Sequence, residues 1–232
     1  AIAAVVTERP EQGADAAELV VVDYDPLEPV PDVDTALAGD VLVFPTHGSN
    51  VVASFGAAPD HDMFDGCEVV VRQRMANQRL APAPIEPRGC VACWEHGHLT
   101  FWTSTQSVHS VRNALVEQLG VAREDLRVIT PDVGGGFGAK MSLYRDEAVV
   151  AWIARHLGRP TRWVETRTES MVVMHHGRGQ VHDVAIGGTR EGRVLAYHLS
   201  IVQDAGAYPE TGAFLPYMTR LMAQGCYEID RV

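Results

Sequence analysis

The sequence predicts a mixed α+β fold, in which helices and strands first alternate and strands then pair with one another. A glycine-rich stretch at residues 131–140 lies between a strand-like run at 126–130 and an amphipathic segment at 143–157. Residues 107–119 repeat apolar side chains at three- and four-residue spacing, as a helix does, and Gly120 follows as a C-terminal cap. Two extended runs at 181–188 and 194–202 flank a turn at 189–193 and predict an antiparallel hairpin. One doubly wound parallel sheet fits this order less well.

The first third of the chain is less regular. Residues 1–6 and 20–24 are apolar enough for two strands, with a short helix at 11–19 between them. Prolines within residues 25–31 end this unit and begin a linker, and residues 37–66 show little regular pattern. Because the chain begins within a predicted strand and stops just after another, we expect it to be a piece of a longer protein.

Regular structure is predicted again from residue 68. An extended run at 68–76 is followed by prolines between 82 and 87, which no central strand tolerates. Residues 91–94 and 99–102 then form a hairpin around 95–98, and residues 161–164 form a further strand. The helix predicted at 143–157 has one apolar stripe, which is expected to face the core: Val149, Trp152, Ile153 and Leu157.

Composition excludes several classes of protein. The formal net charge of −11 argues against a nucleic-acid partner, and no apolar run is long enough to span a bilayer. Cys90 and Cys93 form a C-x-x-C pair, but residues three apart on a strand point to opposite faces, so a metal or redox site is not expected there. We expect the four cysteines to be reduced thiols of a cytoplasmic protein.

The glycine loop admits three interpretations, because so many glycines reduce stability and are kept for close approach or for unusual backbone angles. A Walker A loop is excluded, since Lys140 follows an alanine and precedes a methionine. Gly134, Gly136 and Ala139 fit the dinucleotide pattern G-x-G-x-x-A, and Glu165 could bind a ribose, but residues 131–133 separate the strand from the first glycine. The third interpretation is a cofactor loop of another kind.

Two predicted loops, at 103–106 and 132–140, each leave a strand and enter a helix. If those strands are neighbours, Gln106 lies at the same edge as Phe137 and Gly138. A side-chain amide and exposed backbone N–H groups would then converge. Such donors can hold an oxyanion or a metal-bound oxo group.

Five motifs together resemble those of one family. They are Glu-Pro-Arg-Gly at 86–89, Thr-Ser-Thr-Gln at 103–106, Gly-Gly-Gly-Phe-Gly-Ala-Lys at 134–140, Trp-Val-Glu-Thr-Arg at 163–167 and Asp-Ala-Gly-Ala-Tyr at 204–208. The chain resembles, over nearly its whole length, the molybdopterin-binding large subunit of the molybdenum hydroxylases: xanthine dehydrogenase, aldehyde oxidase and aerobic carbon monoxide dehydrogenase. By this resemblance, residues 1–30 end a hammerhead-type α/β domain and 31–66 are a linker. Residues 67–232 are then the first molybdenum-cofactor-binding domain, incomplete at its C-terminus.

The resemblance implies an oxidoreductase with a molybdenum–molybdopterin cofactor, a pyranopterin dithiolene in its plain or cytosine-dinucleotide form. The implied activity is hydroxylation of an aldehyde or an N-heterocycle, or oxidation of carbon monoxide, with water as the oxygen source. Gln106 would hydrogen-bond the oxo group of the metal, and Gly135, Gly136, Phe137 and Gly138 would line the cofactor. Gln106 and Phe137 would contact the ligands of the metal, and no protein atom would bind the metal itself.

Two departures from the family pattern limit these expectations. Met141 stands where purine-oxidising members carry a carboxylate, so a purine substrate is not expected. The family's catalytic glutamate, in a Gly-x-Gly-Glu motif, has no counterpart before Val232, so the general base is expected beyond it and the chain alone is expected to be inactive. Iron–sulfur clusters and FAD are expected only on partner subunits or fused domains. A nicotinamide-dependent dehydrogenase and a non-catalytic scaffold remain as alternatives.

Other polar residues are expected to be structural. The acids at the start of the helix at 143–157 suit the helix macrodipole. Solvated or core roles are expected for three histidines: His109, His175 and His176. A structural ion-pair cluster is expected from Glu165, Arg167 and Glu169.

Overall fold

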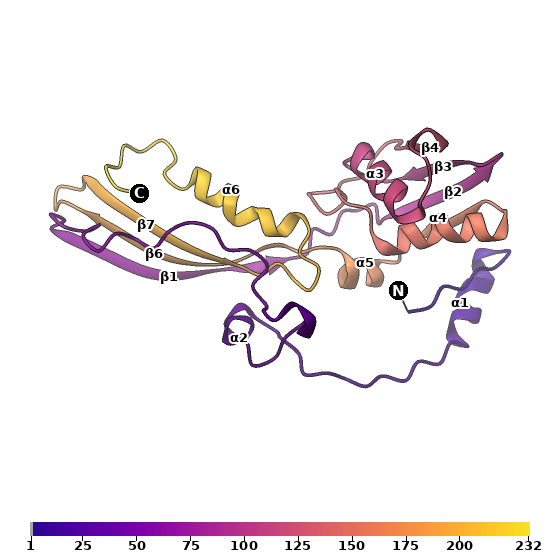
Figure 1. Ribbon diagram of the computed structural model, residues 1–232, viewed down its shortest axis with the longest axis horizontal. Helices are drawn as coiled ribbons and strands as arrows, with labels where there is room; N and C mark the ends of the chain where they lie inside the picture. The colour runs from indigo at the N-terminus through magenta and orange to yellow at the C-terminus, as the bar shows by residue number, and fades with distance from the viewer. Residues whose placement is uncertain (1) are drawn as a thin grey trace.

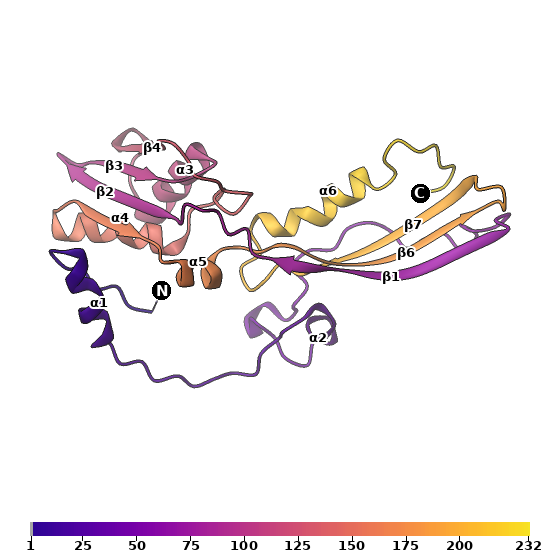
Figure 2. The same ribbon diagram turned by 180° about the vertical axis from the view of Figure 1, so that it is seen from behind.

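The computed structural model describes residues 2–232, which form two lobes and an N-terminal arm, residues 2–38, that carries α1 and α2 (Figure 1). One lobe holds a four-stranded sheet in the order β4-β3-β2-β5, and the other holds a three-stranded sheet in the order β1-β6-β7. The two lobes are also separate when the chain is viewed from behind (Figure 2). The strands are β1 (Val69–Leu80), β2 (Gly89–Glu95), β3 (His98–Thr103), β4 (Leu126–Ile129), β5 (Thr161–Val164), β6 (Gly177–Gly188) and β7 (Val194–Gln203).

Helices connect these strands. The α-helices are α1 (Pro10–Glu18), α2 (Val33–Ala38), α3 (Val108–Leu119), α4 (Arg145–Leu157), α5 (Arg167–Val173) and α6 (Leu215–Met222). The 3₁₀ turns are η1 (Pro45–His47), η2 (Arg123–Asp125) and η3 (Thr211–Phe214). None of the helices in residues 2–232 is both long and apolar enough to cross a membrane.

The four-stranded lobe confirms the predicted hairpin and the helix after it. Strand β2 pairs antiparallel with β3 and β5, while α3 is the crossover that brings β4 parallel to β3. The hairpin turns through His96 and Gly97, both with positive φ, which matches the twist of paired strands. Buried strand residues such as Phe101 pack with Val111 and Leu115 of α3 to form the apolar core.

Helix α4 corrects the predicted apolar stripe. Trp152 is 54% exposed and Leu157 is 46% exposed, although both were expected to face the core. The buried face of α4 is instead made of small residues: Ala148, Val150, Ala151 and Ala154. Alanines let the helix lie close to the sheet, where Trp94 of β2 donates from its indole N–H to the carbonyl of Ala151 at 3.0 Å. Trp152 stacks on His156 at the surface.

The three-stranded sheet confirms the second predicted hairpin, and β6 extends it back to Gly177. Strand β1 pairs with β6 over almost its whole length and ends at Leu80, just before the prolines. The only buried apolar residues on these strands are Ala185 and Ala196. Helix α6 lies along β7. Neither α5 nor α6 was predicted, because each is too short for its apolar spacing to be read from the sequence.

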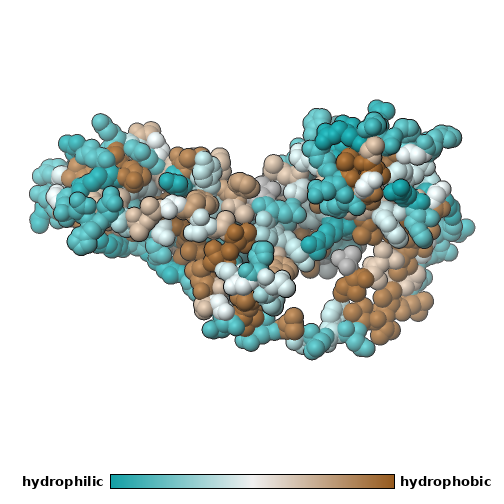
Figure 3. Space-filling view, viewed as in Figure 1, coloured by the Kyte–Doolittle hydropathy of each residue, from teal (hydrophilic) through white to brown (hydrophobic). Residues whose placement is uncertain are grey.

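The N-terminal arm carries the largest error in the predicted secondary structure. The helix at 11–19 is present as α1, but residues 2–6 and 20–24 are not strands, and residue 1 lies outside the described residues. A strand needs a partner for its N–H and C=O groups, and none of the described residues pairs with these segments. The arm is apolar at its surface, with Leu19, Val21 and Leu27 more than four-fifths exposed (Figure 3).

Candidate functional site

The two loops predicted to share an edge lie side by side. Because β3 and β4 run parallel as neighbours, the segments after their carboxyl ends leave the sheet at the same edge. The backbone N–H of Gln106 donates to the carbonyl of Lys140 at 2.8 Å. The conditional prediction that joined Gln106 to the glycine loop is therefore confirmed as geometry.

Gln106 holds the loop with one end of its side-chain amide. Its Oε1 accepts from the N–H of Gly138 at 3.0 Å and from the N–H of Lys140 at 3.2 Å. Since both partners are donors, the oxygen must face the loop and Nε2 must face away from it. No described residue accepts from Nε2, and the side chain is exposed. Gln106 thus presents a neutral hydrogen-bond donor at the sheet edge.

The loop glycines meet different constraints. Gly136 is buried, and a Cβ there would lie 2.5 Å from Cδ of Gln106. Gly135 and Gly138 have φ of 100° and 90°, which side chains rarely adopt. The backbone N–H groups of Gly135, Gly136 and Phe137 have no acceptor among the described residues. The loop that packs on Gln106 therefore carries three N–H donors without an acceptor among the described residues.

Phe137 has a backbone conformation that is unusual for a residue other than glycine. Its φ is 53°, and its side chain is 74% exposed. A bulky residue in this left-handed conformation costs on the order of 1–3 kcal/mol, and such strain concentrates at functional sites. An exposed aromatic ring beside unpaired N–H groups suits a ligand with both apolar and acceptor surfaces.

An ion pair that the sequence did not predict joins buried Lys140, at the end of the glycine loop, to half-buried Glu86. Lys140 Nζ donates to Oε2 of Glu86 at 2.8 Å and to Oγ of Ser104 at 2.9 Å. Although partial burial opposes ionisation, hydrogen bonds from Lys140, Ser104 and Gly134 hold the pKa of Glu86 below its ordinary value. The motifs that contain these residues signalled their importance, but nothing in the sequence paired them.

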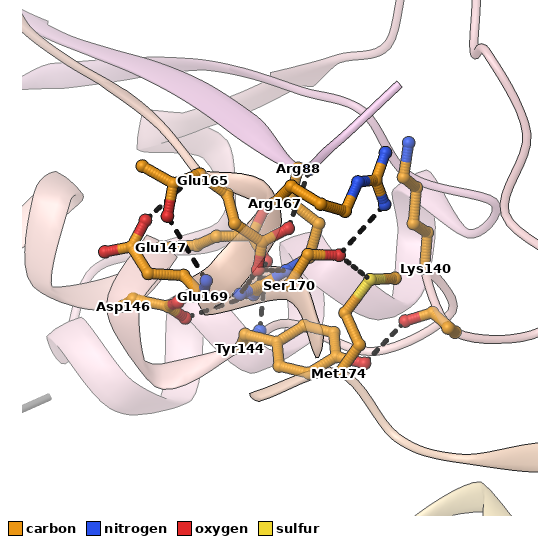
Figure 4. A network of polar contacts seen from close by, with 12 residues as sticks. Arg88, Lys140, Tyr144, Asp146, Glu147, Glu165, Arg167, Glu169, Ser170 and Met174 are labelled. Atoms are coloured by element: carbon orange, nitrogen blue, oxygen red, sulfur yellow. Dashed lines mark hydrogen bonds and ion pairs between the residues drawn. The ribbon is translucent and has the colours of Figure 1, made fainter. Parts of the chain in front are cut away.

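Arg88 is the centre of a second buried network (Figure 4). Its guanidinium donates to Glu165 and, through two nitrogens at 2.8 and 3.1 Å, to Asp146. It also lies over the ring of Tyr144, 3.9 Å from the centroid. Burial opposes its charge, but these hydrogen bonds raise the pKa of Arg88 above its ordinary value. Tyr144 in turn donates from its hydroxyl to the carbonyl of Ala139, at the end of the loop.

This network corrects the expected cluster of Glu165, Arg167 and Glu169. Glu165 pairs with Arg88, whereas Arg167 donates to the carbonyls of Pro84 and Ile85. Glu169 accepts from the N–H of Thr166 and caps α5. Three residues close in sequence thus serve three different partners, because β5 and α5 point them in different directions.

The acids at the start of α4 do more than suit its dipole. Asp146 accepts from Arg88, and buried Glu147 accepts from Oγ1 of Thr103 at 2.6 Å and from the N–H of Tyr144 at 3.1 Å. Burial raises the pKa of Glu147. These contacts join the first turn of α4 to β3 and to Arg88, the residue before β2.

The histidines and cysteines form no site of their own. His176 Nε2 lies 2.9 Å from the carbonyl of Asp204, His175 packs against Tyr144, and His109 is exposed. Cys90 is buried while Cys93 faces the other side of β2, and the four cysteines are free thiols. Within residues 2–232, no group of three or more His, Cys, Asp or Glu side chains is placed to bind a metal ion.

The dinucleotide interpretation gains no support. In that motif the glycine turn opens directly into a helix, whereas α4 begins at Arg145, well after Gly138. Glu165, the proposed ribose-binding acid, is fully buried against Arg88. The edge offers neutral donors from Gln106 and the loop backbone, with the only loop cation buried. Such a site can orient acceptor atoms of a bound group without adding charge to it.

Comparison with known proteins gives a consistent result. The family profile described as "Molybdopterin cofactor-binding domain" matches residues 43–232. The chain is 34% identical to the 6-hydroxypseudooxynicotine dehydrogenase complex subunit gamma of Paenarthrobacter nicotinovorans, over 89% of this chain and 26% of that protein. It is 32% identical to the carbon monoxide dehydrogenase large chain of Hydrogenophaga pseudoflava, over 99% of this chain and 31% of that protein.

Solved structures agree with the sequence relatives. Quinoline 2-oxidoreductase from Pseudomonas putida 86 superposes with a TM-score of 0.90 at 32% identity, covering 95% of this chain and 29% of that one. The chain therefore spans under a third of the length of these relatives.

Proposed function

Because this chain belongs to the molybdopterin cofactor-binding domain family of the molybdenum hydroxylase large subunits, we propose that its glycine loop and Gln106 form one wall of the cofactor site. The observation that carries the proposal is the set of donors at the edge of the four-stranded sheet. Gln106 Nε2 and the N–H groups of Gly135, Gly136 and Phe137 have no acceptor among the described residues. They fit a cofactor that is rich in acceptor atoms.

Each loop residue has a defined part in this proposal. When bound, the molybdenum–pyranopterin cofactor supplies the metal centre at which a substrate is oxidised with oxygen from water. Gln106 donates from Nε2 to an acceptor of the cofactor, and its orientation is fixed by the two N–H groups that bind its Oε1. Gly135, Gly136 and Gly138 would let the backbone approach the cofactor, and the exposed ring of Phe137 would offer it an apolar contact that excludes water.

The activity of the whole protein is part of the proposal. We propose oxidative hydroxylation of an aldehyde or N-heterocycle, or oxidation of carbon monoxide, by a longer large subunit whose general base lies outside these residues. Met141, which is 40% exposed beside the loop, offers no carboxylate to a purine. Electrons then pass to iron–sulfur and FAD partner subunits or domains, and the pterin is in its plain or cytosine-dinucleotide form. We assign residues 1–30 to the preceding hammerhead-type domain, 31–66 to a linker and the protein to the cytoplasm.

Gln106→Glu in the full-length protein tests this function. Glutamate can still accept from the two loop N–H groups but cannot donate from its outward atom at neutral pH. Molybdenum and pterin content, or turnover, should fall by about ten- to a hundred-fold. Thermal melting of the cofactor-free protein should be unchanged, because the contacts to the loop remain. Full cofactor content and full turnover in Gln106→Glu would remove Gln106 from the site.

A further inference from the structure

We propose that Glu86 and Lys140 are positioning residues, which clamp the glycine loop in the shape that presents Gln106. The inference rests on the proposed function of the loop. The Nζ of Lys140 and the Oε2 of Glu86 contact each other, and both contact Ser104. Their part is to fix the two ends of residues 134–140.

All three N–H groups of the Lys140 ammonium donate hydrogen bonds within the protein. Its side chain is 0% exposed, and Nζ donates to the carbonyl of Glu86 at 2.9 Å, to Oε2 of Glu86 at 2.8 Å and to Oγ of Ser104 at 2.9 Å. An ammonium group has three protons, so no donor remains for a ligand. A lysine beside a glycine loop invites comparison with phosphate-binding loops, but this one cannot act as a ligand for an anion without leaving its site.

Glu86 holds both ends of the loop through one oxygen. Its Oε2 accepts from the N–H of Gly134 at 2.7 Å, from Oγ of Ser104 at 2.6 Å and from Lys140 Nζ. Gly134 is the first residue of the loop and Lys140 the last. A Cβ on Gly134 would lie 2.5 Å from Cβ of Glu86, so the backbone is as close to Glu86 as glycine allows. The clamp therefore sets the distance between the loop ends.

The backbone of Lys140 transmits this position to Gln106. Its N–H donates to Oε1 of Gln106 at 3.2 Å, and its carbonyl accepts from the N–H of Gln106 and from Oγ1 of Thr105, both at 2.8 Å. A displacement of Lys140 would thus tilt the amide that presents Nε2. Since the clamp is an ion pair, it holds the loop without placing net charge beside the cofactor.

The test uses the full-length protein with two single variants, the double variant that combines them, and one control variant. Lys140→Met keeps the volume of the side chain, while Glu86 retains the N–H of Gly134, the hydroxyl of Ser104 and partial solvation. Glu86→Gln keeps an acceptor oxygen and removes the charge. Arg159→Met is the control, because Arg159 pairs only with Glu8 in an exposed salt bridge. Hydrogen exchange of residues 131–144 in the cofactor-free protein and molybdenum and pterin content are the two measurements.

Lys140→Met should raise the exchange rate of the loop about tenfold, because it removes hydrogen bonds of a charged donor. Cofactor content should fall about tenfold, as expected when an orienting contact is lost. Glu86→Gln should have a smaller effect in the same direction. The double variant should be no worse than Lys140→Met alone, since both changes break one interaction. Arg159→Met should match the wild type.

Three outcomes in the variants would overturn the inference while leaving the proposed function standing. Unchanged exchange in Lys140→Met would show that there is no clamp, and a loosened loop with full cofactor content would show that the clamp positions nothing. If Lys140→Met does not fold, unchanged exchange and content in Glu86→Gln would decide against it. A wild-type protein without molybdenum and pterin would instead overturn the proposed function, and the inference with it. The molybdenum and pterin content of the wild type therefore distinguishes failure of the inference from failure of the proposed function.

Discussion

At the scale of single residues, the loop glycines differ in what they make possible. Gly136 leaves room for Gln106, and Gly135 and Gly138 adopt backbone angles that favour glycine. Phe137 adopts a similar angle without being glycine and keeps its ring exposed. The sequence predicted that this loop and Gln106 belong together. It could not assign a reason to each glycine, because the reason is a backbone angle at Gly135 and Gly138 and the approach of Gln106 at Gly136.

Gly136→Ala in the full-length protein tests whether Gly136 leaves room for the side chain of Gln106. The new Cβ would lie 2.5 Å from Cδ of Gln106, so Gln106 must move and its Nε2 with it. Molybdenum and pterin content should fall by about tenfold. The matched control is Gly13→Ala in α1, where a Cβ meets only Oγ1 of Thr7 at 3.6 Å. Gly13→Ala should leave cofactor content unchanged. Equal content in both variants would contradict the packing of Gln106 on Gly136.

At the scale of elements, the sequence predicted those that are neighbours along the chain and missed most long-range pairs. The β2–β3 and β6–β7 hairpins and the α3 crossover follow from local spacing and turn residues. The partners of Arg88 lie 58 and 77 positions away, so no local pattern reveals them. The strands predicted at residues 1–6 and 20–24 were wrong for a related reason. Apolar composition predicts a strand whether or not a partner strand exists.

Arg88→Met should destabilise the four-stranded lobe by about 3–5 kcal/mol, the range for removing one partner of a buried ion pair. Glu165, whose side chain is 0% exposed, would lose the cation that compensates its charge. Chemical denaturation of the two proteins measures this loss.

Arg162→Met is the matched control for Arg88→Met, since Arg162 lies exposed on β5 of the same sheet. It should change stability by no more than about 0.5 kcal/mol. A loss in Arg88→Met as small as that of the control would mean that the buried network contributes little.

The stability of the protein should depend on alkaline pH through Tyr144, the residue before α4. Burial raises the pKa of its hydroxyl to about 12. The fold therefore favours the protonated phenol, so this stabilisation is complete below the ordinary pKa of about 10 and is lost as the pH rises through 12. At pH 11 the wild type should have lost about 1 kcal/mol that Tyr144→Phe does not lose. Parallel stability curves for the two proteins between pH 9 and 11 would contradict this assignment.

At the scale of the whole molecule, the lobe with the four-stranded sheet has a larger apolar core than the lobe with the three-stranded sheet. The buried hydrophobic cluster lies on the four-stranded sheet, on helices α3 and α4 and at Leu143, just before α4. The three-stranded sheet buries small residues and is joined to the other lobe by residues 81–88 and 165–176 (Figure 1). The arm is held by exposed ion pairs, Glu8 with Arg159 and Asp34 with Arg74, which contribute little. Sequence spacing predicted both sheets but not this inequality, which depends on which faces the helices cover.

Hydrogen exchange of the 232-residue chain should report the inequality directly. Strands β2 and β6 are a matched pair, because each is an inner strand with hydrogen-bonded neighbours on both sides. They differ in apolar cover: β2 buries Cys90 and Ala92 under α4, whereas the largest apolar residue buried on β6 is Ala185. If burial of apolar surface sets local stability, amides of β2 should exchange at least about tenfold more slowly than those of β6. Equal protection would mean that strand pairing alone sets the stability of each lobe. Slower exchange in β6 than in β2 would mean that the lobe with the three-stranded sheet is the more stable one.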